Sequence, residues 1–244
     1  CSGYALSNAC RSWPLFTASL LRIQSFPAVF SGVLHEKLDR SMTTDPKLQS
    51  NVVQLHASKQ PTIEFWYEFG STYSYLSAMR IETQARDAGV NVSWRPFLLG
   101  PIFKKSGWDT SPFNLYPSKG RYMWRDMERQ CARYGLPLTI PDPFPQAGLL
   151  AARIAQAGRT QPWIGDFTRA VFIAEFGSGE DISDEAFLAH LLLEAGAPAK
   201  DVLEAAKSPE IKDALRASVG EAEDKGIFGA PSFVLQNGEL FWGD

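Results

Sequence analysis

Two serines, Ser71 and Ser74, stand three residues apart in the stretch FGSTYSYLS, residues 69–77. An alternating run typical of a strand precedes this stretch, and a run typical of a helix follows it. The free N–H groups and the dipole of a helix N-terminus favour an anion, to which a serine hydroxyl can donate one more hydrogen bond. A serine nucleophile is unsupported, because no histidine is near Ser71 and no G-x-S-x-G elbow is present. Two interpretations stay open: Ser71 stabilises an anion that another molecule brings, or it only caps the helix.

A second candidate position, Ala230-Pro231, lies far downstream at the head of a strand-like run. Proline at the start of a strand is commonly an edge residue, and only about 5–6% of X–Pro bonds are cis. The sequence alone therefore leaves the isomer of this bond undecided. Beyond the run, Asn237-Gly238 separates two apolar segments and predicts a β-hairpin with a type I′ turn.

Three segments must place Ser71 at the edge of a sheet. Residues 62–69 alternate between apolar and polar side chains, and with VNVSWRPF, residues 90–97, they predict two strands. The run from Tyr73 to Ala88 predicts one helix of about four turns, which Gly89 ends. Strand, helix and strand make a βαβ unit, so we expect parallel pairing and a right-handed crossover.

The middle of the chain predicts about five helices in succession. Glycines end the helices expected at 118–134, 146–157, 161–176 and 183–195, and Ser208-Pro209 begins the last helix with a cap and an N1 proline. We therefore predict an α/β fold, in which a mixed sheet from residues 61–100 and 226–244 receives an all-helical insertion over residues 101–225.

The composition excludes several classes of function. The chain of 244 residues is 45% hydrophobic, which is enough for a sizeable core, and its net charge of −3 argues against nucleic acid as a partner. No run of 18 apolar residues predicts a membrane-spanning helix. The three cysteines, Cys1, Cys10 and Cys131, form no C-x-x-C pair, which fits a reducing compartment such as the cytoplasm and makes a dithiol oxidoreductase an unsupported alternative. The histidines show no metal-ligand spacing, so we expect no metal site.

Residues 1–60 differ from the rest of the chain. They contain no acidic residue before Glu36, while arginines and many serines are present, which is typical of a transit leader and would imply a mitochondrial protein. The alternative, which we favour, is a non-native extension ahead of a start at Met42. Under either interpretation we expect a disordered N-terminal segment before a domain over residues 61–244.

Four segments in combination resemble one family of enzymes. They are FWYEFGSTYSYLS, WRPFLLGPIFKKSGW, PSKGRYMWRDMER and GIFGAPSFVLQNGELFWGD, and they span about residues 62–244. This combination is similar to the 2-hydroxychromene-2-carboxylate isomerases and the related kappa-class glutathione transferases. The resemblance implies a thioredoxin-like sheet with a helical insertion, as in the DsbA-like branch of that fold.

The resemblance also implies glutathione as the cofactor. The matching positions for its binding are Ser71, Thr72, Tyr73, Lys119, Ala230, Pro231 and Asp244. Ser71 would hydrogen-bond the glutathione sulfur and favour its thiolate, and Ala230, before a cis-proline, would pair with the glutathione peptide through its backbone. Lys119 would meet a glutathione carboxylate, the alternative being an exposed surface lysine. Asp244 matches the first position of a dipeptide that binds the γ-glutamyl end.

The chain departs from the family pattern at two positions, one of which is among those named above. Thr72 stands where the family usually has proline, and Trp108 stands where many members have an asparagine that contacts glutathione or substrate. Trp108, with Tyr122 and Trp124 from the first long inserted helix, is a candidate for an aromatic substrate site. Core or helix packing is the alternative for all three residues.

The resemblance implies a glutathione-dependent isomerase that interconverts 2-hydroxychromene-2-carboxylates and ring-opened benzylidenepyruvates in aromatic degradation. A kappa-type transferase or peroxidase is the nearest alternative, and a redox-inactive DsbA-like binding module is the alternative from a different class. The expected partner is a small aromatic substrate, without nucleic acid or membrane, and the resemblance is compatible with a homodimer.

Overall fold

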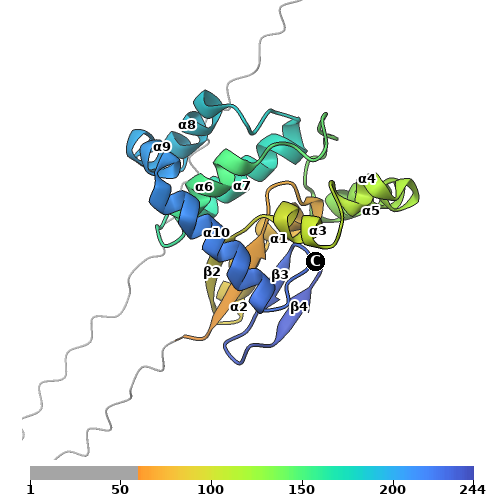
Figure 1. Cartoon of the computed structure of the whole chain (residues 1–244), viewed down its shortest axis with the longest axis horizontal. Helices are drawn as coiled ribbons and strands as arrows, with labels where there is room; N and C mark the ends of the chain where they lie inside the picture. Colours follow the sequence, from red (N-terminus) through yellow and green to blue (C-terminus); the bar gives the residue numbers. More distant parts are fainter. Residues whose placement is uncertain (1–59) are drawn as a thin grey trace, which may run out of the picture. The chain divides into compact units, whose positions relative to one another are not determined.

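The computed structural model describes residues 60–244, and the predicted leader lies outside them except for its last residue. Four strands form one mixed sheet in the order β2-β1-β3-β4 (Figure 1). The first two strands, β1 (Thr62–Tyr67) and β2 (Asn91–Pro96), pair in parallel, with Phe65 opposite Trp94. The last two, β3 (Ser232–Val234) and β4 (Leu240–Trp242), form an antiparallel hairpin, and β3 also pairs antiparallel with β1. The predicted α/β architecture with its parallel βαβ unit is confirmed.

The crossover between β1 and β2 is two helices, so the single helix predicted from Tyr73 to Ala88 is wrong. The helices are α1 (Thr72–Ala78) and α2 (Ile81–Asp87). The break falls at Arg80, whose N–H bonds the Ser77 carbonyl at 3.0 Å in a tight turn. The Arg80 side chain donates to the Leu76 carbonyl and lies over the Tyr134 ring, 4.0 Å from its centroid. Tertiary contacts therefore override a helical sequence pattern here.

The insertion contains more helices than the sequence pattern predicted. Its elements are α3 (Leu99–Lys105), α4 (Pro112–Leu115), α5 (Pro117–Tyr134), α6 (Leu149–Ala157), α7 (Ile164–Phe172), the π-helix η1 (Ile173–Ser178), α8 (Glu185–Glu194), α9 (Ala199–Lys207) and α10 (Pro209–Asp224). The sequence pattern located α5, α6, α8 and α10 within a few residues and missed α3, α4 and α9. The helix expected at 161–176 is α7 continued by the π-helix η1.

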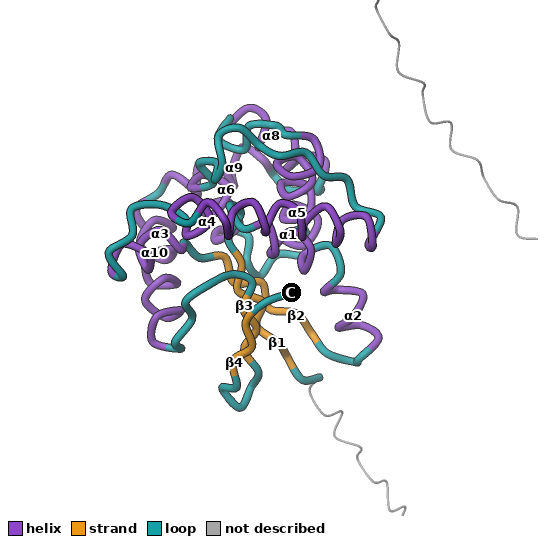
Figure 2. The backbone as a smooth tube through the Cα atoms, turned by 90° about the vertical axis from the view of Figure 1, so that its right-hand side faces the viewer, coloured by secondary structure: helices purple, strands orange, loops and turns teal. Residues whose placement is uncertain are grey.

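The sheet separates two hydrophobic cores. Figure 2 shows α3 and α10 on one side of the sheet. The smaller core, which contains Trp66, Phe97 and Val234, includes residues of both helices. On the other side, α1 and the inserted helices α5 to α9 surround a larger core around Phe65 and Tyr67. Because side chains alternate along a strand, neighbouring residues of β1 anchor opposite layers.

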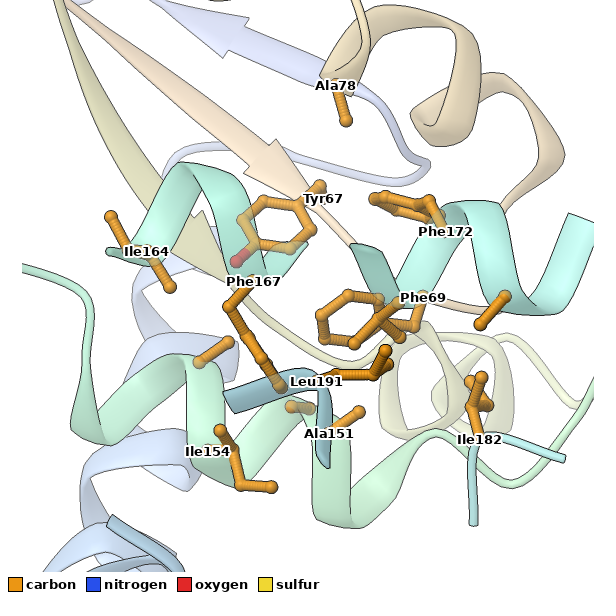
Figure 3. Packing of buried hydrophobic residues seen from close by; sticks show 14 of the residues in the cluster. Tyr67, Phe69, Ala78, Ala151, Ile154, Ile164, Phe167, Phe172, Ile182 and Leu191 are labelled. Carbon is orange, nitrogen blue, oxygen red and sulfur yellow. The ribbon is translucent and has the colours of Figure 1, made fainter. Parts of the chain in front are cut away.

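The larger core holds the end of β1 firmly just before Ser71. Tyr67 and Phe69 pack against Phe172 of α7, and the ring centroids of Phe69 and Phe172 are 5.2 Å apart (Figure 3). The buried Tyr67 hydroxyl is hydrogen-bonded to Thr168 Oγ1 at 3.0 Å. The insertion thus fixes the strand end from which the β1–α1 turn departs.

The hairpin is present, but its turn differs from the type I′ turn predicted. The Gly238 N–H bonds the Leu235 carbonyl at 2.9 Å, so the central residues of the turn are Gln236 and Asn237. Gly238 follows with φ of 85°. This arrangement is a three-residue hairpin loop in which glycine takes the left-handed position.

Candidate active site

A cleft of about 1030 Å³ opens beside the C-terminal end of β1, and we call it the Ser71 cleft. Its walls come from segments far apart in the sequence: the turn 68–73, the α3–α4 region 98–113, Lys119, Asp126 and Gln130 of α5, the loop 144–149, residues 228–231, and residues 242–244. The carboxyl edge of a parallel strand and the N-terminus of the next helix meet here, which is the usual ligand position in open α/β sheets.

Ser71 caps α1 and also joins the two ends of the domain. Its Oγ accepts a hydrogen bond from the Ser74 N–H at 3.2 Å and donates one to the Ala230 carbonyl at 2.9 Å. The capping interpretation is therefore met by the geometry, and Ser71 and Ala230, 159 residues apart in sequence, face one another in the cleft. An anion bound at this helix N-terminus competes with the Ala230 carbonyl for the single Ser71 proton.

The Ala230-Pro231 bond is cis, which the sequence alone left undecided. Ser232 Oγ donates to the Gly229 carbonyl at 2.8 Å, and the Gly243 N–H bonds the Pro231 carbonyl at 3.1 Å. These bonds hold the loop beneath the cleft.

The two residues that follow Ser71 line the cleft in different environments. Thr72 is 1% exposed, and its Oγ1 is shielded without a hydrogen-bond partner in the described part of the chain. Tyr73 is half-buried and donates its hydroxyl to Asp126 of α5 at 3.0 Å. Burial and the Asp126 carboxylate raise the pKa of Tyr73 well above its usual range, so this phenol stays protonated.

Lys119, Asp244 and Trp108 also line the cleft, each with a partner from the protein. The Lys119 ammonium lies over the Tyr116 ring, 4.8 Å from its centroid, and the residue is exposed. Asp244 accepts a hydrogen bond from Ser77 Oγ at 2.6 Å and pairs with Arg80. Trp108 is half-buried and packs against Phe103, with 5.7 Å between ring centroids.

The structure does not bring Tyr122 or Trp124 to the cleft. Tyr122 is 63% exposed on α5, so it faces solvent. Trp124 packs edge-on against Phe144, with 4.9 Å between ring centroids, and it is Phe144 that lines the cleft. For Trp124 the geometry favours the packing alternative, with Phe144 between it and the cleft.

Two aromatic residues that the sequence pattern did not single out form a lip of the cleft. Phe228 and Trp242 are 55% and 61% exposed, and their ring centroids are 4.9 Å apart. Gly229 lets the indole pack closely over the backbone, because a Cβ at this position would lie 2.4 Å from the Trp242 indole nitrogen. Two exposed aromatic residues at the mouth of a cleft offer a surface on which a flat apolar ring can stack.

Two carboxyl groups were also missed. Glu68 lines the cleft, and burial raises its pKa to about 7, while the Leu99 N–H that faces it offsets part of this rise. Glu175 of η1 is 0% exposed, and neither of its carboxyl oxygens has a hydrogen-bond partner in the described residues. Burial, and secondarily the charge of Glu68, raise the pKa of Glu175 well above its usual range. The local pattern gives no signal for this pair, because 107 positions separate the two residues in the sequence.

Residues 62–244 match the family described as the DSBA-like thioredoxin domain. This chain belongs to that family. It is 30% identical to 2-hydroxychromene-2-carboxylate isomerase of Sphingobium xenophagum over 185 residues, which cover 75% of this chain and 92% of the relative. It is 26% identical to glutathione S-transferase kappa 1 of Homo sapiens, over 71% of this chain and 80% of the relative.

A solved structure shares the same architecture. The structure of a 2-hydroxychromene-2-carboxylate isomerase superposes with a TM-score of 0.67 at 21% identity, covering 75% of this chain and 88% of that one. The expected family and the thioredoxin-like fold with a helical insertion are therefore confirmed. At the family level the chain is grouped with isomerases and glutathione transferases.

A membrane-spanning helix must meet requirements of length and apolar composition. Within residues 60–244, none of the helices combines the length and the apolar composition that crossing a bilayer requires.

Proposed function

We propose that this protein is a glutathione-dependent isomerase that acts on 2-hydroxychromene-2-carboxylates and their ring-opened benzylidenepyruvate isomers. The observation that carries the proposal is the meeting of Ser71 and the Ala230 backbone at the N-terminus of α1, inside a cleft large enough for a small molecule. The 30% identity to an isomerase of that name over most of both chains supports the substrate class.

The residues of the cleft fit glutathione in three respects. Its volume of about 1030 Å³ is at the upper end of the roughly 300–1,000 Å³ typical of small-molecule sites, which suits a tripeptide together with an aromatic ring. The helix N-terminus favours a negative charge beside Ser71. The exposed Lys119 ammonium lies where it can meet a carboxylate.

When bound, glutathione would supply a thiolate, the nucleophile that reversible addition to a conjugated double bond requires. The part of Ser71 is to turn its hydroxyl proton from the Ala230 carbonyl to the sulfur. A free thiol has a pKa of about 8.5, and a hydrogen-bond donor at a helix N-terminus lowers this value towards neutrality. Phe228 and Trp242 would hold the aromatic ring at the mouth of the cleft, and Trp108 would border it from the other wall.

A kappa-type transferase is the alternative that the second group of relatives favours. The same binding residues would serve both activities, and the two differ only in what happens to the acceptor. The redox-inactive binding module remains the alternative in which the cleft holds a peptide without chemistry.

The test is a titration of the protein with glutathione. Binding is measured by calorimetry, and thiolate formation is measured by ultraviolet absorbance. We expect saturable binding, a thiolate signal, and conversion of 2-hydroxychromene-2-carboxylate. Conjugation of 1-chloro-2,4-dinitrobenzene without isomerisation would identify a transferase instead. Absence of saturable binding would contradict both enzymes and favour the binding module.

Two variants make this test specific for Ser71. Ser71→Ala should lose the thiolate signal, because it removes the donor. Ser74→Ala is the matched control: it removes a hydroxyl that is buried and has no partner among the described residues, and the signal should persist.

A further inference from the structure

Glu68 occupies the turn that leads from β1 to Ser71. Its backbone carbonyl accepts the Ser71 N–H at 3.1 Å, so the two residues belong to one tight turn. Glu68 is one of the residues that line the same cleft as Ser71, and it is only partly exposed. A carboxyl group is thus fixed beside the helix N-terminus at which a ligand anion would bind.

Glu175 of η1 is the second carboxyl group of the pair, and it is fully buried. Both of its oxygens are shielded from solvent and lack a hydrogen-bond partner in the described residues, and the backbone amide of Gln146 that faces them is not within hydrogen-bonding geometry. Burying an unpaired carboxylate is far more costly than burying the neutral acid. Glu175 therefore holds its proton, and Glu68 is the member of the pair that can exchange one with the cleft.

The charged groups around the pair are already engaged elsewhere. The groups that face the two carboxyls are the Leu99 N–H of α3 and the Gln146 amide of the loop before α6, and both are uncharged. Two cations at or beside the cleft have other partners: Lys119, which lines it, lies over Tyr116, and Arg80 pairs with the cleft residue Asp244. Tyr73 is tied to Asp126. Among the described residues, the pKa of Glu68 is thus raised by burial and lowered in part by the Leu99 N–H.

We propose that Glu68 is the proton acceptor of the Ser71 cleft, taking the thiol proton of the bound thiol ligand and returning it on release. The S–H bond breaks, the electron pair stays on sulfur, and the proton moves to a Glu68 carboxylate oxygen, which leaves the total charge of the site unchanged. Ser71 then hydrogen-bonds the sulfur. This assignment rests on the proposed function, because it takes glutathione as the thiol.

Glu68 suits this task because its pKa lies near neutral pH. Burial brings the pKa of Glu68 to about 7, so the carboxylate is available at pH 7.5 and holds a proton well once it has received one. An ordinary glutamate, with a pKa of about 4.3, would return that proton to water at once.

The test counts the protons that glutathione binding releases to the buffer. Calorimetry at pH 7.5 in two buffers of different ionisation enthalpy gives this number, and ultraviolet absorbance gives the amount of thiolate formed. For the unchanged protein we expect well under one proton released per thiolate, because Glu68 keeps it. For Glu68→Gln we expect about one proton per thiolate. Equal release of about one proton by both proteins would overturn the proposal.

A second measurement needs no ligand and also guards against loss of folding. Titration of the carboxyl groups by carbon-13 NMR should show one group with a midpoint near 7, absent in Glu68→Gln and present in the exposed control Glu204→Gln. If every midpoint that Glu68→Gln removes lies below pH 5, Glu68 is not the acceptor. Failure of glutathione to bind while the midpoint near 7 is present would instead contradict the proposed function.

Discussion

Ser71 uses one oxygen for two hydrogen bonds, and this makes its role in folding separable from its role in binding. Ser71→Ala removes the cap of the Ser74 N–H and the bond to the Ala230 carbonyl, so the free energy of unfolding should fall by about 1 kcal/mol or slightly more. Denaturant unfolding measures this loss. Ser74→Ala removes a buried hydroxyl without a partner in the described residues, and its effect should lie within about 0.5 kcal/mol of zero. An equal loss in both variants would show that Ser71 stabilises only through packing.

The aromatic lip gives a second prediction at the residue scale. Trp242→Ala should raise the KM for 2-hydroxychromene-2-carboxylate about three- to tenfold, because an aromatic pair contributes about 0.5–1.5 kcal/mol beyond its buried area. Stability should change little, since the residue is 61% exposed. Tyr122→Ala is the matched control, because Tyr122 is equally exposed but lies outside the cleft. An equal rise of KM in both variants would show that the lip does not bind the ring.

At the scale of elements, local sequence patterns predicted the strands of the sheet. They missed the helix break at Arg80 and the short helix α4. The two parallel strands and the hairpin follow from alternation and from an Asn-Gly pair, which are signals within ten residues. The Arg80 side chain at the break packs over Tyr134, more than fifty positions away, and no local pattern shows such a contact. The short helix α4 carries too few residues to show a period.

The residues of the candidate site were likewise predicted only in part. Ser71, Ala230 and Lys119 were predicted from the family pattern, and the structure brings all three to one cleft. The sequence pattern treated Glu68 as an ordinary polar position of an alternating strand, because its raised pKa comes from burial in the folded protein. Tyr122 and Trp124 were chosen for their aromatic character, but which face of a helix meets a cleft depends on how the helix docks.

Two glycines inside helices provide a prediction about how α4 and α5 fit together. Gly120→Ala in α5 should lower the free energy of unfolding by about 1–3 kcal/mol, because the added Cβ would lie 2.4 Å from the Phe113 carbonyl of α4. Gly220→Ala in α10 is the matched control, since nothing lies within 4 Å of its added Cβ. Helix propensity alone should make that change stabilising by about 0.5–1 kcal/mol. If both substitutions raise the free energy of unfolding, α4 must move to make room for the added Cβ on α5.

At the scale of the whole molecule, the two carboxyls should make stability depend on pH. The pKa of Glu68 is raised from 4.5 to about 7 on folding, and that of Glu175 is raised in the same direction. A raised carboxyl pKa contributes its full stability below the unfolded pKa and loses it as the pH rises through the folded value. The free energy of unfolding should therefore fall between pH 5 and pH 8, by up to about 3 kcal/mol for Glu68.

The measurement is denaturant unfolding at several pH values across this window. Glu175→Gln should flatten the fall, and the exposed Glu204→Gln should leave it unchanged. Asp181 and Glu210, whose pKa values are lowered, act below this window and do not disturb the comparison. Stability that rises from pH 5 to pH 8 would contradict the burial of two neighbouring carboxyls.

The walls of the Ser71 cleft come from segments more than 150 positions apart, and this gives the cleft a thermodynamic use. An unfolded chain cannot assemble such a set of residues, so a compound that binds the cleft binds only the folded protein. By linkage, a ligand at a hundredfold its Kd adds about 2.7 kcal/mol to the free energy of unfolding. A melting-temperature screen of thiols and aromatic acids can therefore search for the natural ligands before any reaction is known.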